Sequence, residues 1–279
     1  MATWNGADPP VVAPPRSWQR VVGVFRGLAM FLGTLPLYAT YVLGMRLLQR
    51  IFPSFQSWRV TKRLWGRWCL WCFGVRLEQR GTPMQGPGAL VVNHATWLDI
   101  IALMGTGPLC FVAKAEVRHW PIVGPMAAYG GTLFIERKSS EAKRQAAALK
   151  AALDAPERLT FFPEGTSTDG RRVLEFKSSL FGMFFEDDVP AGLHVQPATV
   201  VYRPPAGQPE GFFGWWADMP FFKSVWDILC QSWGARVVIV LHPPLAAADF
   251  ADRKALAAAA GEAVRGGMAE VLGHPVPSV

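Results

Sequence analysis

The chain has 279 residues, 51% of them hydrophobic and 12% aromatic, and its 28 Lys and Arg side chains exceed its 21 Asp and Glu side chains. This length and composition exclude an intrinsically disordered chain and allow one large domain or two small ones with a proper core. Only 18% of the residues are charged, which is a low fraction for a soluble enzyme, so we expect part of the surface to meet lipid.

The basic charge is concentrated in the first part of the chain. Residues 1–77 contain ten basic residues and one acidic residue, whereas residues 78–279 contain 18 basic and 20 acidic residues. A basic segment of this kind suits either a nucleic acid or an anionic membrane. Its apolar surroundings favour the membrane and argue against a nucleic-acid partner.

The first sixteen residues are rich in Pro and Ala and predict a loose tail. Gly27 to Met45 then carries no formal charge, and as a helix it is about 28 Å long, close to the hydrocarbon thickness of a bilayer. Pro36 lies at its centre, so a straight crossing and a kinked or hairpin-like insertion both remain open. The alternative is a helix buried in a protein core.

A second helix is predicted over Trp58 to Phe73. On a helical wheel most of its Trp and aliphatic side chains share one half and its basic side chains share the other, which is typical of a helix at a membrane interface. A helix packed on the protein with a solvated basic edge is the alternative. Cys69 and Cys72 within it have the spacing of a metal or redox pair, but no second pair or His cluster accompanies them, so we predict no metal site.

From residue 75 the pattern changes to short apolar runs that alternate with helical ones, as in α/β proteins. We therefore predict an α/β fold with a single mixed or mostly parallel sheet flanked by helices, preceded by an N-terminal membrane-associated helical module. The expected organisation is a tail over 1–16, a membrane-embedded or interfacial module over 17–74 and a catalytic domain over 75–279. The predicted strands are 75–79, 89–93, 110–113, 132–136, 159–162, 195–202 and 236–241, and the predicted helices are 98–104, 140–153, 179–185 and 250–272.

The first chemical motif follows the predicted strand that ends near Asn93. His94 and Asp99 face apart on a regular helix, but across a strand-to-helix turn they can meet. A carboxylate on one imidazole nitrogen holds the tautomer in which the other nitrogen accepts a proton, as a general base does. Alternatively, Thr96 and Asp99 form a helix capping box and His94 is an ordinary turn residue.

Three further motifs also lie at strand ends, so we expect all four at one rim of the sheet. Arg137 follows a strand and suits phosphate or carboxylate recognition, or is a surface residue. A loop with Glu164, Gly165 and Thr166 follows the next strand, where the alternative is an ordinary turn. Pro197 stands early in a strand, which predicts an edge strand or a backbone contact with a ligand.

These motifs, in this order and spacing, resemble the glycerolipid acyltransferase family of lysophosphatidate acyltransferases. The resemblance covers about residues 58–245 and includes Lys114, in a segment like the one between the family's first two motifs. The motifs that carry it are Asn93-His94-(x)4-Asp99, Gly131 to Arg137, Phe162-Pro163-Glu164-Gly165-Thr166 and Val195-Gln196-Pro197.

The resemblance implies transfer of a fatty acyl group from acyl-CoA or acyl-carrier protein to the hydroxyl of a lysophospholipid, most simply lysophosphatidate, without a further cofactor. His94 would be the general base and Asp99 would orient it. Arg137, together with Lys114, would bind the acceptor's phosphate. The resemblance also implies that Glu164, Gly165 and Thr166 belong to the substrate-binding residues.

One departure from the family pattern concerns the acceptor. Ser167 stands where phosphatidate-making members often carry Arg, and the loop also resembles that of the lyso-ornithine lipid acyltransferase branch. An amino-acid lipid acceptor is therefore the alternative, and the aromatic tract over 215–222 suits it or forms an interfacial loop.

Two hypotheses from other classes remain at this point. A hydrolase would use His94 and Asp99 to activate water on a thioester or lysolipid, and a lipid-binding scaffold would need the motifs only as structure. For the transferase, cytosolic acyl donors and positive flanks predict an inner-membrane location with the site on the cytoplasmic face and an anionic membrane as partner.

Overall fold

The computed structural model describes residues 4–44, 49–51, 57–120, 124, 127–128, 130–135, 142–153, 155, 157–186, 189 and 192–277. Its α-helices are α1 (Ser17–Leu43), α2 (Gln49–Ile51), α3 (Ser57–Phe73), α4 (Leu98–Met104), α6 (Ala142–Leu153), α7 (Phe221–Gln231) and α8 (Arg253–Leu272). Shorter 3₁₀ turns are η2 (Ala115–His119), η4 (Ser178–Phe184) and η5 (Ala247–Asp249).

The strands within the described residues form one sheet. They are β1 (Val75–Arg80), β2 (Gly88–Val92), β3 (Leu109–Lys114), β4 (Leu133–Ile135), β5 (Arg158–Phe161), β6 (His194–Arg203), β7 (Ala235–Leu241) and β8 (Leu245–Ala246). Their order is β1-β7-β6-β2-β5-β3-β4, and β8 pairs with β6. Only the β6–β7 and β6–β8 pairs are antiparallel, so the predicted mixed, mostly parallel sheet is confirmed.

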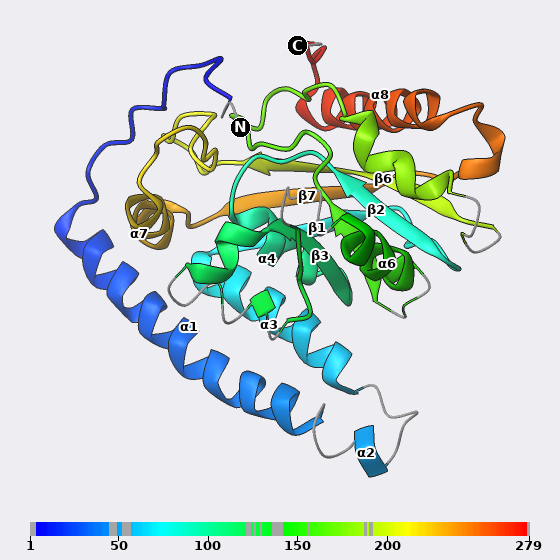
Figure 1. Ribbon diagram of the computed structural model, residues 1–279. Helices are drawn as coiled ribbons and strands as arrows, with labels where there is room; N and C mark the ends of the chain where they lie inside the picture. Colours follow the sequence, from blue (N-terminus) through cyan, green and yellow to red (C-terminus); the bar gives the residue numbers. More distant parts are fainter. Residues whose placement is uncertain are drawn as a thin grey trace.

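Helices cover both faces of this sheet (Figure 1). One hydrophobic cluster joins the sheet to α3, α4 and α7 through residues such as Phe73, Leu98 and Ile228. The cluster on the other face joins it to α6, η4 and α8 through residues such as Leu153, Phe181 and Met268. Because both faces are covered, the central strands are largely buried, and they carry buried polar residues such as Thr160, Gln196 and Thr199 beside their apolar ones.

Most predicted elements occur within two or three residues of their expected bounds, and two differences have physical causes. Helix α7 was not predicted, since its sequence follows an aromatic tract that is also typical of a loop. Helix α1 begins ten residues before the uncharged stretch and continues through Pro36 without interruption. The two basic residues in this first part of the helix are accommodated differently: Arg20 is exposed, and Arg26 donates to the Leu229 carbonyl of α7 at 2.7 Å.

Pro197 does not mark an edge strand, so that prediction was wrong. β6 is central, with β2 on one side and β7 and β8 on the other. The Pro197 carbonyl accepts from the N–H of His242 at 2.9 Å, so its nitrogen faces the same side. There the pairing with β8 ends at Val195 and the pairing with β7 begins at Ala198. The missing N–H therefore removes no ladder bond.

The two long N-terminal helices are packed on the sheet domain as successive layers. α3 lies on α4, and α1 lies outside both α3 and α7 (Figure 1). Glycines permit the closest approaches: a Cβ on Gly23 would lie 2.5 Å from Cys230 Sγ, and one on Gly33 would lie 2.3 Å from Trp68 Nε1. By length and composition α1 is the one helix among the described residues that is able to cross a membrane.

The outer side of α1 and α3 is apolar and uncovered. The exposed residues on α1 recur at helical spacing: Trp18, Val21, Phe25, Leu28, Leu32 and Leu35. Val60, Leu64 and Trp71 continue the exposed surface on α3. We call this set the apolar face. So many large apolar side chains exposed on two packed helices are unusual for a protein surface in contact with water alone.

The basic side of α3 is not simply solvated. Lys62 is 7% exposed and its Nζ lies 2.7 Å from Glu157 Oε1 and 2.6 Å from the Gly130 carbonyl. Arg67 donates to the carbonyl of Gly105 at 3.1 Å. These cations fasten the helix to the sheet domain, which the charge pattern alone does not distinguish from a face turned to solvent or lipid.

Residues 4–16, for which the sequence suggests a loose tail, lie against the domain. The Trp4 N–H donates to Thr166 Oγ1 at 3.4 Å, and the Trp4 ring packs edge-on against Trp216 at 5.6 Å between centroids. Further along, Gln231 donates to the Ala13 carbonyl at 3.1 Å. Aromatic and amide contacts of this kind over long sequence separations leave no signal in the local pattern.

Helix α8 offers a stability test with a matched control. A Cβ on Gly267 would lie 2.4 Å from His242 Cε1 and 2.6 Å from Thr199 Oγ1, whereas one on Gly266 would have no neighbour within 4 Å. We expect Gly267→Ala to lower the free energy of unfolding by about 2 kcal/mol through overpacking. Gly266→Ala should raise it by about 0.5–1 kcal/mol through helix propensity. Urea unfolding checks both, and equal effects would contradict the packing of α8 on His242.

Candidate active site

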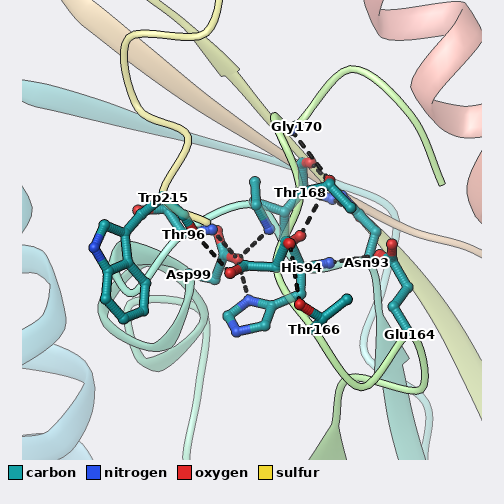
Figure 2. A network of polar contacts seen from close by, with 12 residues as sticks. Asn93, His94, Thr96, Asp99, Glu164, Thr166, Thr168, Gly170 and Trp215 are labelled. Carbon is teal, nitrogen blue, oxygen red and sulfur yellow. Dashed lines mark hydrogen bonds and ion pairs between the residues drawn. The ribbon is translucent and has the colours of Figure 1, made fainter. Parts of the chain in front are cut away.

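The carboxyl ends of the parallel strands meet at one edge, and the turn after β2 carries His94 there. His94 Nδ1 lies 2.7 Å from Asp99 Oδ2, and this oxygen also accepts from the backbone N–H groups of Ala95 at 2.8 Å and Thr96 at 3.0 Å (Figure 2). Asp99 is fully buried in the first turn of α4, whereas the His94 side chain is 21% exposed. The carboxylate thus holds the turn and the imidazole together, whereas Thr96 Oγ1 has no hydrogen-bond partner among the described residues, so only the Asp99 half of the predicted capping box forms.

This geometry leaves the second ring nitrogen of His94 available. With Nδ1 toward a carboxylate, the proton lies on Nδ1 and Nε2 carries the free lone pair. Among the described residues, Nε2 makes no hydrogen bond, and the ring stacks on Phe162 with 4.1 Å between centroids. The imidazole is therefore oriented, partly exposed and able to accept a proton at Nε2.

Asn93 fixes the start of this turn. Its side-chain amide donates to the Val200 carbonyl at 3.0 Å and accepts from the Val200 N–H at 2.8 Å. These two bonds extend the pairing of β2 with β6 by one position beyond the last backbone pair, Val92 with Ala198. The Asn93 side chain makes the two bonds that a further backbone pair would make, so the backbone itself is free to turn immediately before His94.

Glu164, in the loop after β5, links this loop to the His94 turn. It is 1% exposed, its Oε1 accepts from the His94 N–H at 2.7 Å and its Oε2 accepts from the Leu174 N–H at 3.0 Å. Burial, with Asp99 and Asp169 nearby, raises the pKa of Glu164 to about 8 against the effect of the two N–H donors. Each oxygen accepts one backbone N–H, so Glu164 joins the His94 turn to the segment at Leu174.

The rest of that loop closes over the same turn. Gly165 has φ +71°, a conformation that favours glycine. Thr168 donates its N–H to the His94 carbonyl at 2.9 Å. Ser167 is buried and its hydroxyl donates to the Trp215 carbonyl at 2.5 Å, while the Trp215 N–H donates to the Ala95 carbonyl at 2.9 Å (Figure 2).

Aromatic rings gather beside the His94 turn. Phe221 at the start of α7 packs against Trp97, Trp120 and Trp215 with centroids 5.5–6.3 Å apart. The rings come from three segments of the chain and give this side of the site an apolar wall. Such a wall suits a substrate with a hydrocarbon chain.

Of the two predicted cationic residues of the site, the structure describes Lys114 but not Arg137. Lys114 ends β3, two strands from β2, which is about 10 Å along the rim at normal strand spacing. It is exposed. Arg137, in the segment after β4, lies outside the described residues. The structure thus brings His94, Asp99, Glu164, Gly165 and Thr166 together and places Lys114 further along the same rim.

Three residues of this network were missed by the sequence analysis. Thr168 and Trp215 hold the His94 turn through backbone bonds, and Tyr202 is buried beside Asp99. Thr168 follows the predicted loop directly, so proximity to it was a usable signal. Trp215 lies in the aromatic tract over 215–222, but no local pattern indicates its backbone bond to the His94 turn, and Tyr202 reaches the site only through the fold.

Comparisons with known proteins identify the family to which this geometry belongs. Residues 75–201 match the family model described as Acyltransferase. The chain is 41% identical to the lyso-ornithine lipid O-acyltransferase of Rhodobacter capsulatus, over 96% of this chain and 97% of that protein. It is 31% identical to the 1-acyl-sn-glycerol-3-phosphate acyltransferase of Neisseria meningitidis, over 74% and 79% of the two chains.

A solved structure agrees on the fold. The crystal structure of the 1-acyl-sn-glycerophosphate acyltransferase PlsC from Thermotoga maritima superposes with a TM-score of 0.57 at 20% identity, and the match covers 90% of this chain and all of that one. The predicted resemblance is therefore confirmed along the chain, with the His94 turn and the Glu164 loop both inside the matched domain. On these grounds the chain belongs to the acyltransferase family and is an acyltransferase.

Proposed function

We propose that this protein transfers a fatty acyl group from a thioester to the free hydroxyl of a lyso-ornithine lipid. The observation that carries the chemistry is the His94–Asp99 pair, with His94 Nε2 free at the rim of the sheet. The acceptor is proposed from the 41% identity to the Rhodobacter capsulatus enzyme over nearly the whole of both chains.

In the proposed reaction His94 Nε2 takes the proton of the acceptor hydroxyl while the hydroxyl oxygen attacks the thioester carbonyl carbon. Asp99 stabilises the imidazolium that forms. Collapse of the tetrahedral intermediate breaks the carbon–sulfur bond, and the departing thiolate takes the proton back from His94. Acyl-CoA or acyl-carrier protein supplies the thioester, and the reaction as written needs no further cofactor.

The loop after Glu164 supports the choice of acceptor. Ser167, at the position where an Arg would be expected for a phosphate, is buried and bonded to the Trp215 carbonyl. This position therefore offers no positive charge to a phosphate. Lysophosphatidate remains the second candidate because the Neisseria meningitidis relative is 31% identical, with Lys114 and Arg137 as the proposed phosphate ligands.

We also propose that residues 17–74 hold residues 75–279 on the cytoplasmic face of the inner membrane. The apolar face of α1 and α3 supports this arrangement. α1 contacts α7 near Gly23 and α3 near Gly33, so it is held along the domain and lies in the interface with its outer side in lipid. The basic N-terminal part favours anionic lipid.

The membrane proposal predicts the effect of charges on the apolar face. In the double variant Phe25→Glu and Leu32→Glu, binding to anionic vesicles should weaken about 100-fold, because each position loses the transfer of a large apolar side chain into lipid. Val11→Glu is the control, since Val11 is 93% exposed but lies outside both helices. Vesicle sedimentation measures the binding, and equal binding of all three proteins would contradict the assignment of this face.

The function is tested with purified protein in vesicles. Lyso-ornithine lipid and lysophosphatidate are supplied in parallel with labelled acyl-CoA or acyl-carrier protein, and products are resolved by mass. Acylated ornithine lipid as the main product supports the proposal, and phosphatidate as the main product moves the function to the second candidate. Free fatty acid without either lipid product would identify a hydrolase.

A further inference from the structure

The Asp99 carboxylate is only half used by the contacts described above. Oδ2 accepts from the His94 ring and from the N–H groups of Ala95 and Thr96. Oδ1 is buried and has no hydrogen-bond partner among the described residues. A buried carboxylate oxygen without a donor is costly, so an unused donor close to it is significant.

Tyr202 carries such a donor. Its side chain lies on the α4 face of the sheet, in the same hydrophobic cluster as Val200 and Leu98, and its ring stacks on Phe213 with 5.0 Å between centroids. Its hydroxyl is buried and also has no hydrogen-bond partner among the described residues. Burial and the neighbouring Asp99 carboxylate raise the pKa of Tyr202 well above its usual value. Because Tyr202 packs in one cluster with Leu98, the neighbour of Asp99 in the first turn of α4, its buried hydroxyl is a potential donor to Asp99 Oδ1.

We propose that Tyr202 is a positioning residue for the acyl transfer: its hydroxyl donates to Asp99 Oδ1 in the working enzyme and fixes the carboxylate that orients His94. The inference rests on the proposed function. Each of the two unpartnered atoms supplies what the other lacks, and bonds of this kind in a free enzyme often shorten only when substrate is bound. Tyr202 touches neither substrate nor the reacting atoms.

The bond has two expected effects on catalysis. It holds the plane of the carboxylate, so that His94 Nε2 keeps its direction toward the acceptor, and it draws negative charge away from Asp99. The titratable groups that face Asp99 from the elements packed on it are His94, Glu164 and Tyr202, with Asp169 beyond Glu164. Without the phenol, Asp99 stabilises the imidazolium more strongly.

The test is Tyr202→Phe, which keeps the ring stacked on Phe213 and removes only the hydroxyl. We expect kcat to fall about tenfold with little change in KM for the acceptor, as for loss of one hydrogen bond to a charged group. The acidic limb of the pH–rate profile should move to higher pH. In an Asp99→Asn background Tyr202→Phe should have no further effect on kcat, because the two residues act as one unit.

The opposite outcome is equally specific. If the hydroxyl is only an unpartnered group in the core, Tyr202→Phe raises the stability and leaves kcat and the pH profile unchanged, which overturns the proposal. A tenfold loss that persists in the Asp99→Asn background also overturns it. Phe213→Leu is the packing control: it should lower stability while the acidic limb stays in place.

A measurement without substrate separates this inference from the proposed function. The NMR resonance of the His94 Nδ1 proton, which lies toward Asp99, should shift in Tyr202→Phe, and an unchanged resonance overturns the inference. Wild-type protein that acylates neither lysolipid in the vesicle assay overturns the proposed function instead. The two failures are therefore distinguishable.

Discussion

Acyl transfer by the His94→Ala variant should be about 10³-fold slower than by the wild-type protein, while the folded structure is kept. Positioned general bases contribute factors of about 10² to 10⁴. The His94 side chain is partly exposed and its main partner is Asp99, so its removal leaves no large cavity in the core. The measurement is single-turnover transfer from labelled acyl-CoA to lyso-ornithine lipid.

Two further variants make the result specific. Asp99→Asn keeps the shape of the side chain but replaces one acceptor oxygen by an NH2 group, which cannot accept from the His94 ring. The rate of acyl transfer by Asp99→Asn should therefore approach that of His94→Ala. His194→Ala is the matched control, because His194 begins β6 at the opposite end from the site and its Nδ1 contacts the Gly192 carbonyl. A loss of similar size in His194→Ala would show that general destabilisation, and not loss of the base, explains the effect.

Glu164→Ala should both destabilise the protein and remove most of its activity. The substitution leaves the buried N–H groups of His94 and Leu174 without an acceptor, at a cost of about 1–3 kcal/mol each. Transfer should fall at least 100-fold because the His94 turn loses its support. Glu164→Gln retains one acceptor oxygen, so its stability and its rate of acyl transfer should lie between those of Glu164→Ala and of the wild-type protein. Urea unfolding and the transfer assay measure the two effects, with the exposed Glu175→Ala as control.

The stability of the wild-type protein should also depend on the ionisation of Glu164. The pKa of Glu164 in the folded protein, about 8, lies above the ordinary carboxyl value of 4.5, so the folded protein binds the proton more tightly than the unfolded chain. The contribution to the free energy of unfolding is then complete below about pH 4.5 and declines as pH rises toward 8. Glu164→Gln should remove this decline. An equal pH dependence in both proteins would contradict the raised pKa.

Local sequence patterns predicted the parts of the fold that local physics determines. The β2 strand is a continuous apolar run, and Leu98–Met104 has a helical pattern after an acidic first turn, so both were found with nearly correct bounds. The rim was predicted because polar motifs follow parallel strands. The hydrogen bonds from the Asn93 side chain to the Val200 backbone depend on strand order, which the sequence does not reveal, and so does the place of Tyr202.

Charge and burial were harder to predict than element type. Lys62 falls on the basic half of α3 in a helical wheel, yet it is buried because Glu157 lies opposite it in the fold. Pro197 indicates an edge by its chemistry, yet it stands in a central strand because the neighbouring ladder has a gap at that residue. Both cases need a partner from a distant segment, which composition and periodicity do not contain.

In the proposed membrane arrangement, the close approach of α3 to α4 sets the height of His94 above the lipid. A Cβ on Gly66 would lie 2.6 Å from the Gly105 nitrogen and 2.8 Å from the Ile101 carbonyl oxygen, so the two helices meet backbone to backbone. One of them presents Trp71 on its outer side and the other holds Asp99. If α1 and α3 rest on lipid as proposed, the depth of the protein in the interface is thereby tied to the level of His94. The proposed function then predicts that an acceptor lipid is selected in part by how far its hydroxyl projects from the bilayer.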